Sequence, residues 1–341
     1  MKKLIKLLLC LLMFLLVGCI EKETVVDEVP DAENSVFTEK GRLFVTSGEN
    51  VYEIKKSSDS FYKDEIYEYE ENEKRVVFAG ITQVKDKLFV VGGSFNPDCS
   101  EPPSFSDLLS GNIDRFYQML SNMFLDIKIF EADLTFTNTV LKPVYTLNSV
   151  IMPNGMTSDN EGNIYVVDMA PSPLGKIVKL NSDCLSCSEE IFANYNQNIV
   201  LANGLTIYDN TMYFTDNDAR NPLNIKRYVK KLPLDYKNGE IAETIFDKTG
   251  PSIFDDLTNG ELFGLKGILV TDYFKGQLHF IPFNKKFRSR STPVGSFKGP
   301  SSVSFGKGNF DPDELIVTEK GIPFELRSSV GNKVTKAYFS K

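Results

Sequence analysis

The chain has little of the chemistry on which many enzyme classes depend. It contains one histidine, no tryptophan and only five cysteines among 341 residues. A single histidine makes a Ser-His-Asp triad improbable, and no G-x-S-x-G motif is present. A phosphate-binding P-loop and a dinucleotide-binding glycine fingerprint are also missing. His279 lies in an apparent outer strand, so we expect it to be structural.

Positive charge is scarce as well. Lys and Arg number 38 against 46 Asp and Glu, a net charge of −8. Removing the first eighteen residues deletes Lys2, Lys3 and Lys6 and lowers the net charge from −8 to −11. An acidic chain without a basic stripe is a poor candidate for binding nucleic acid.

The N-terminus has the pattern of a bacterial lipoprotein signal. Its lysines precede an apolar run, Leu7 to Leu16, that is too short to span a bilayer stably. The run ends in Leu16-Val17-Gly18-Cys19, which resembles a lipobox. We expect residues 1–18 to be removed and Cys19 to carry lipid, which would anchor the protein in the cell envelope, outside the cytoplasm. The alternative is an ordinary secretory signal with an incidental cysteine.

The segment that follows, residues 19–32, is polar and acidic without periodicity, and predicts a flexible tether. Beyond it the chain holds only Cys99, Cys184 and Cys187. Outside the cytoplasm Cys184 and Cys187 can pair with each other, or one of them with Cys99. A zinc site would need a second pair of ligands, which the sequence lacks.

A short phrase recurs along the rest of the chain. NGMT starts at Asn154, NGLT at Asn203 and DDLT at Asp255, and each precedes a β-rich run. Related units open near three other positions, Ser35, Ala79 and Ser301. Six strand–turn–strand units at intervals of about 45 to 75 residues predict an all-β fold, a six-bladed β-propeller over residues 33–341. Either the C-terminal KVTKAYF or a strand from the tether is expected to complete blade six.

One segment of blade two breaks this pattern. Residues 96–125 contain apolar side chains at helical spacing, at Leu109, Ile113, Phe116, Leu120 and Met123. We therefore expect a helical insertion. It either roofs the centre of the propeller or packs on the rim without a functional contact.

Oxygen-bearing side chains open several of the repeated units. Asn154, Asn203 and Asp255 come from three successive blades, and Glu33 precedes its strand by the same interval as Asn154. Two amides and two carboxylates suit Ca²⁺, which takes six to eight oxygen ligands. Asp256 is an alternative ligand to Asp255. The opposing interpretation is that Asn-Gly and Asp-rich phrases are ordinary turn chemistry.

These motifs resemble the family of senescence marker protein, gluconolactonase and luciferin-regenerating enzyme. PNGMTSDNEGNIYVVD, ANGLTIYDNTMYFTD and the opening at Glu33 carry the resemblance, which covers about residues 33–320. It implies a six-bladed propeller with an axial Ca²⁺, or another divalent cation, held by Glu33, Asn154, Asn203 and Asp255. It further implies hydrolysis of lactones or organophosphate esters, with Asp255 as general base or nucleophile. The family has Asp-Gly where this chain has Asp255-Asp256.

The sequence thus predicts a membrane-anchored, calcium-dependent hydrolase of a lactone or related ester. The main alternative is a non-catalytic propeller that serves as a binding scaffold, because fold does not imply function. A third and weaker alternative is a metal-independent condensing activity like that of strictosidine synthase.

Overall fold

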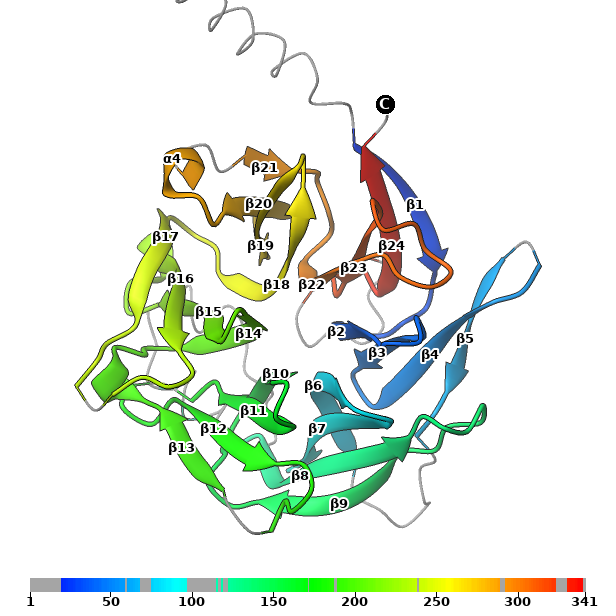
Figure 1. Cartoon of the computed structure of the whole chain (residues 1–341), viewed down its shortest axis with the longest axis horizontal. Helices are drawn as coiled ribbons and strands as arrows, with labels where there is room; N and C mark the ends of the chain where they lie inside the picture. The colour runs from blue at the N-terminus through cyan, green and yellow to red at the C-terminus, as the bar shows by residue number, and fades with distance from the viewer. Residues whose placement is uncertain are drawn as a thin grey trace, which may run out of the picture.

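The structure is a closed ring of six four-stranded antiparallel sheets (Figure 1). This computed structural model describes residues 20–339 apart from 59, 68–74, 97–114, 116–117, 119–121, 171, 187–188, 238, 289–291 and 323–329. The predicted six-bladed propeller is confirmed. The predicted signal peptide, Cys19 and nearly all of the predicted helical insertion lie outside the described residues.

Each blade contributes four consecutive strands, numbered from the axis outward, except blade six. Blades one and two comprise β2 (Ala32–Phe37), β3 (Leu43–Ser47), β4 (Asn50–Lys56), β5 (Phe61–Glu65), β6 (Val76–Val84), β7 (Lys87–Phe95), β8 (Phe124–Asp133) and β9 (Lys142–Leu147). Blades three and four comprise β10 (Pro153–Ser158), β11 (Asn163–Asp168), β12 (Lys176–Asn181), β13 (Glu190–Ala193), β14 (Ala202–Tyr208), β15 (Thr211–Asp218), β16 (Lys226–Pro233) and β17 (Glu243–Thr249). Blades five and six comprise β18 (Phe254–Leu262), β19 (Leu265–Asp272), β20 (Gln277–Pro282), β21 (Thr292–Val294), β22 (Pro300–Phe305), β23 (Leu315–Glu319), β24 (Lys333–Phe339) and β1 (Ile20–Val26). Short helices η1 (Tyr195–Gln197), η2 (Pro222–Asn224) and α4 (Lys285–Arg288) lie between strands.

The ring closes through both ends of the chain. The C-terminal KVTKAYF forms β24, the third strand of blade six, and β1 pairs with it as the outermost strand, from Ile20 opposite Phe339 to Val26 opposite Val334. The prediction of a flexible tether over residues 19–32 is therefore wrong for Ile20 to Val26. Because β1 is an outer strand whose middle side chains are exposed, it shows no apolar alternation.

The hydrophobic core is divided among the six junctions between neighbouring blades. Each junction has its own cluster of buried aliphatic and aromatic side chains. Between blades one and two, for example, the rings of Tyr67, Phe78 and Phe130 lie edge to face with centroids 4.8 to 5.7 Å apart. The second strands of the blades are buried on both faces, as β11 shows along its whole length.

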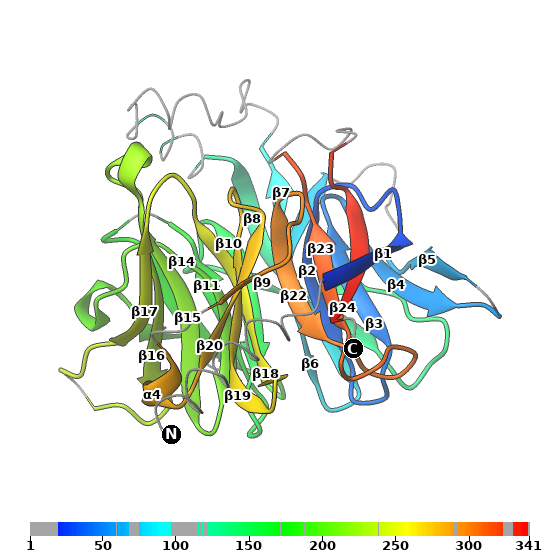
Figure 2. The same cartoon turned by 90° about the horizontal axis from the view of Figure 1, so that it is seen from above.

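The antiparallel order gives the ring two distinct faces. Every innermost strand starts at one face, here called the axial-site face, and the second strand returns to it. The turns between these two strands lie at the opposite, hairpin face. Figure 2 shows the ring from the side, with α4 toward the hairpin face.

Acidic residues at or near the ends of four of the second strands form buried ion pairs, either within a blade or between neighbouring blades. Asp216 contacts Lys230 at 2.6 Å, and Asp272 contacts Arg227 at 2.5 Å. His279 is buried on β20 with Nε2 3.1 Å from Asp272 Oδ2. These contacts are consistent with the structural role expected for His279. They also separate these carboxylates from the predicted ligands.

Candidate axial site

All four predicted ligands lie at one equivalent position, the start of an innermost strand. In each blade the pairing between the first two strands shifts register at this point, which marks a β-bulge. The first bulge residues, blade by blade, are Glu33, Ala79, Asn154, Asn203, Asp255 and Ser301. Asp255 is thus the equivalent of Asn154 and Asn203, and Asp256 occupies the second bulge position.

Buried threonines hold the bulges of neighbouring blades together. Thr215 Oγ1 accepts the backbone N–H of Gly204 at 2.9 Å and donates to the carbonyl oxygen of Asp255 in the next blade at 2.6 Å. Thr46, Thr271 and Thr318 make the same kind of bridge from blades one, five and six. These bridges link the bulge backbones at four of the six junctions between neighbouring blades.

Glycines allow the bulges to approach one another closely. A Cβ atom on Gly155 would lie 2.9 Å from the Cα of Gly204, and one on Gly204 would lie 2.9 Å from the carbonyl oxygen of Asp255. Neither distance is sterically acceptable, so only glycine fits at these two positions. Asn154, Asn203 and Asp255 are therefore immediate neighbours around the axis.

A second ring of residues covers the bulges from the axial-site face. These residues lie at or just beyond the ends of the second strands. Met169 Sδ lies 3.5 Å from Asn154 Nδ2, Asn217 exchanges two 2.9 Å hydrogen bonds with the backbone of Phe254, and the Tyr273 hydroxyl donates to the carbonyl of Gly321 at 3.0 Å. The fourth member of this ring, Lys320, was not anticipated from the sequence.

The Lys320 ammonium group forms an ion pair with Glu33 and lies 3.4 Å from Asp31 Oδ1. Its side chain is only 15% exposed. Burial alone would lower the pKa of Lys320, but the charges of Asp31 and Glu33 outweigh this and hold it well above its usual value. Burial raises the pKa of Glu33, although Lys320 opposes this rise. The Lys320 ammonium group therefore already pairs with Glu33, one of the four predicted metal ligands.

Asp255 has the most strongly perturbed environment of the four. Burial raises the pKa of Asp255 well above its usual value, the neighbouring charge of Glu33 raises it further, and a hydrogen bond from Asn203 works in the opposite direction. Buried carboxyl groups with a raised pKa are frequent at sites of proton transfer. Asp255 is thus the best candidate base of the axial site.

Asp256 lies on the other side of the bulge layer. It borders a cavity of about 270 Å³ along the axis, whose lining is completed by polar and apolar residues of the innermost strands, among them Asn34, Thr206 and Asn259. Burial raises the pKa of Asp256 to about 7, and the charge of Glu33 adds to the effect. Asp255 does not line this cavity, so the two neighbouring carboxyl groups have different surroundings.

Asp256→Asn is expected to stabilise the chain increasingly as the pH rises from about 4 to about 7, and by a constant amount at higher pH. Below the ordinary aspartate pKa of 3.8 the carboxyl group is protonated in both folded and unfolded chains, so the substitution has little effect there. Above about 7 the folded chain retains a poorly solvated charge that the unfolded chain exposes to water. We expect a gain of about 1–2 kcal/mol, limited by partial exposure to the cavity. Urea unfolding at about pH 4 and pH 8.5 measures it. The exposed Asp313→Asn is the control, and equal gains at both pH values would contradict the prediction.

The donor set fits a divalent cation in part. Asn203 Oδ1 is buried, and among the described residues it has no hydrogen-bond partner, as expected of a ligand atom. Glu33 fits only if Lys320 moves away from it. Within the described part of the chain, no group of three or more His, Cys, Asp or Glu side chains is placed to hold a metal ion. Such a site would therefore depend on amide oxygens.

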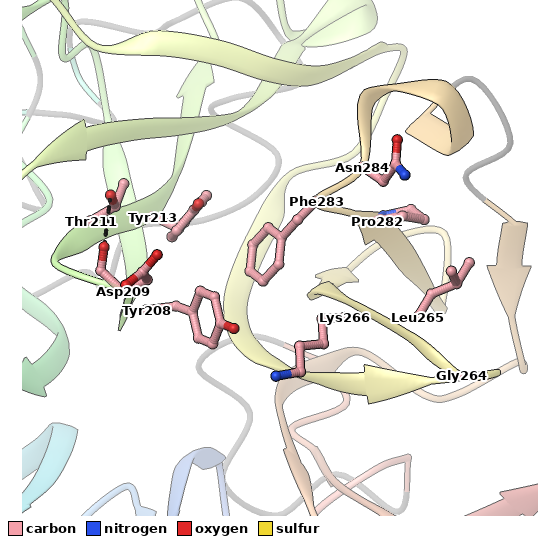
Figure 3. A pocket seen from close by; sticks show the side chains of 10 residues that line it. All are labelled: Tyr208, Asp209, Thr211, Tyr213, Gly264, Leu265, Lys266, Pro282, Phe283 and Asn284. Carbon is pink, nitrogen blue, oxygen red and sulfur yellow. Dashed lines mark hydrogen bonds between the residues drawn. The ribbon is translucent and has the colours of Figure 1, made fainter.

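Several other features lie away from the axis. Cys184 is disulfide-bonded, and its partner falls outside the described residues. A second cavity, of about 430 Å³, lies between the hairpins of blades four and five (Figure 3). Its aromatic wall includes Tyr208 and Phe283, stacked with ring centroids 4.7 Å apart. No helix among the described residues is long and apolar enough to cross a membrane.

No protein-family model and no curated protein sequence matches the chain. Several solved structures, however, are similar to the chain. A luciferin-regenerating enzyme is 15% identical with a TM-score of 0.55, over 94% of this chain and 95% of that one. A gluconolactonase from Xanthomonas campestris is 10% identical with a TM-score of 0.53, over 96% and 93%. The chain shares the six-bladed propeller fold of these two enzymes.

These two neighbours support the family resemblance drawn from the motifs at Asn154 and Asn203. The fold also accommodates other chemistry. The PQQ-bound aldose sugar dehydrogenase from Streptomyces coelicolor is 10% identical with a TM-score of 0.59, over 94% of this chain and 98% of that one. At these identities the likeness shows the fold alone, so the function has to be argued from the axial site.

Proposed function

We propose that the protein is a hydrolase that opens a lactone or cleaves a related ester at the axial site. The observation that carries the proposal is Asp255, a buried carboxyl group with a raised pKa beside the Asn203 amide. In the proposed reaction Asp255 accepts a proton from water as the water oxygen attacks the ester carbonyl carbon. The ester C–O bond then breaks, and the alcohol oxygen leaves with a proton. The gluconolactonase among the structural neighbours suggests the lactone class of substrate.

A divalent cation, Ca²⁺ for preference, belongs to the proposal. Asn154, Asn203 and Asp255 would hold it, together with Glu33 once Lys320 is displaced, and it would polarise the substrate carbonyl. The buried and unpartnered Asn203 Oδ1 supports this assignment.

We also propose that the protein is lipid-anchored through Cys19 in the bacterial cell envelope, facing the periplasm or the exterior. Its partners would then be the bilayer and a small-molecule substrate, not nucleic acid. The lipobox-like Leu16-Val17-Gly18-Cys19 and the acidic net charge support this placement.

Calcium titration by calorimetry tests the metal site directly. A soluble form that begins at Ile20 retains β1 and so keeps blade six complete. We expect about one Ca²⁺ per chain, and we expect the Asn154→Ala, Asn203→Ala double variant to abolish binding because it removes both amide ligands. Asn160→Ala, at an exposed turn, is the matched control. Binding that survives in the double variant would eliminate the axial metal site.

The Lys320–Glu33 ion pair favours a second candidate function, a non-catalytic binding scaffold. On this hypothesis the ammonium group neutralises the carboxylates and ties blades six and one together at the axis. A folded chain that turns over no substrate in a panel of lactones, carboxylic esters and phosphotriesters, with and without Ca²⁺, would support the scaffold.

A further inference from the structure

The hairpin between β18 and β19 has an unusual residue at its tip. Phe263 and Gly264 form a two-residue turn in which both have positive φ, 56° and 71°. Such turns favour Asn, Asp and Gly, and the corresponding turn of blade four is Asp209-Asn210. A bulky side chain in this conformation is rare. Moreover, Phe263 is 52% exposed. Neither backbone geometry nor burial accounts for phenylalanine here.

The Phe263 hairpin lies beside the point where the chain enters the propeller. The Phe263 ring meets the Phe339 ring edge to face, with centroids 4.8 Å apart. Phe339 is paired with Ile20, the first residue of β1. Ile20, Leu265 and Phe339 all pack against the core cluster between blades five and six. These residues form one apolar corner of the hairpin face.

The lipid attachment site expected from the sequence directly precedes Ile20, which belongs to this corner. Cys19 is the expected acylated residue, and consecutive Cα atoms are about 3.8 Å apart. Because β1 begins at Ile20, no tether separates the anchor from the propeller. We propose that Phe263 inserts into the bilayer surface beside the lipid on Cys19, so that the apolar corner rests on the membrane.

The surroundings of the hairpin suit a membrane interface. Exposed Lys266 follows the turn, and exposed Lys22 lies two residues after Ile20 on β1. The neighbouring cleft contains Tyr208 and Phe283, with Lys266 at its edge (Figure 3). Tyrosine and lysine are enriched where a protein meets lipid headgroups, and lysine attracts anionic lipids. With this corner against the bilayer, the axial-site face remains open to solvent. The inference rests on the proposed lipidation of Cys19 and does not depend on the proposed hydrolase activity.

The absence of tryptophan makes the proposal directly measurable. Phe263→Trp introduces a single fluorophore at the hairpin tip of the full-length, processed protein. We expect its emission to shift to shorter wavelength in vesicles of phosphatidylethanolamine and phosphatidylglycerol, and brominated acyl chains to quench about half of it or more. Phe136→Trp is the matched control, because Phe136 is 63% exposed and follows β8 in blade two, across the ring. Its emission should stay at long wavelength and unquenched.

Three results would overturn the proposal. The first is Phe263→Trp fluorescence that bromination leaves unchanged, and the second is equal quenching of the Phe136→Trp chain. The third is a processed chain whose mass includes no acyl group. A further variant separates membrane contact from folding. Phe263→Asn should keep or raise the urea midpoint, because asparagine tolerates positive φ, and a clear fall would make Phe263 a structural residue.

Discussion

Asp255→Asn is expected to lower kcat/KM for the lactone or ester substrate by about 10²- to 10⁴-fold, the usual contribution of a positioned acid or base. The amide keeps the size of the carboxyl group and its place beside Asn203, but it cannot accept a proton from water. Burial already disfavours the charge on Asp255, so the variant should be at least as stable as the parent chain. The measurement is the initial rate on the most active compound of a lactone and ester panel.

Two further variants serve as controls for Asp255→Asn. Asp313→Asn changes an exposed carboxylate of the hairpin face and should leave the rate within about twofold. Asp256→Asn tests whether the neighbouring carboxyl group is the base instead. An unchanged rate in Asp255→Asn, or a selective loss in Asp256→Asn, would remove Asp255 from the proposed mechanism. Unfolding curves of all three variants ensure that only folded chains are compared.

The architecture was largely predictable because its determinants are local and repeated. A β-bulge at the start of each innermost strand requires a small or polar pair of residues, and the following hairpin requires a turn. Phrases such as Asn154-Gly155 and Asn203-Gly204 therefore recur in register with the blades. The same register fixed Asp255 as the residue equivalent to these asparagines. The threonine bridges were not predicted, although Thr215, Thr271 and Thr318 share one position, directly before an acidic residue of their strands.

Lys320 was missed for a physical reason. The four residues Thr-Glu-Lys-Gly occur twice, and Lys40 and Lys320 are the lysines of the two copies. The first copy follows an innermost strand, so Lys40 lies at the hairpin face, 64% exposed and paired with Asp86. The second follows β23, the second strand of blade six, so Lys320 lies at the axis beside Glu33. The two segments have the same local sequence. Which lysine is buried depends only on whether the segment follows the first or the second strand of its blade.

The second large effect is expected from Lys320→Met. This substitution keeps an unbranched apolar stem but leaves the Glu33 and Asp31 carboxylates without their cation. Breaking a buried ion pair in this way typically costs about 3–5 kcal/mol, because an uncompensated charge remains in the interior. We therefore expect the free energy of unfolding at about pH 8 to fall by this amount. Lys40→Met, in the other Thr-Glu-Lys-Gly segment, should change it by no more than about 0.5 kcal/mol.

A double variant and a calcium titration show what the ammonium group does. Adding Glu33→Gln to Lys320→Met removes the unpaired charge of Glu33 and should restore part of the lost stability. If the two substitutions acted independently, the second would instead lower the stability further. In the single variant Glu33 no longer pairs with Lys320 and is free to bind Ca²⁺. The positive charge of Lys320, which repels Ca²⁺, is also absent. Ca²⁺ should therefore bind more tightly and stabilise the fold more than in the parent chain. A Lys320→Met chain with unchanged stability and unchanged calcium affinity would mean that the ammonium group neither supports the ring nor competes for the axial site.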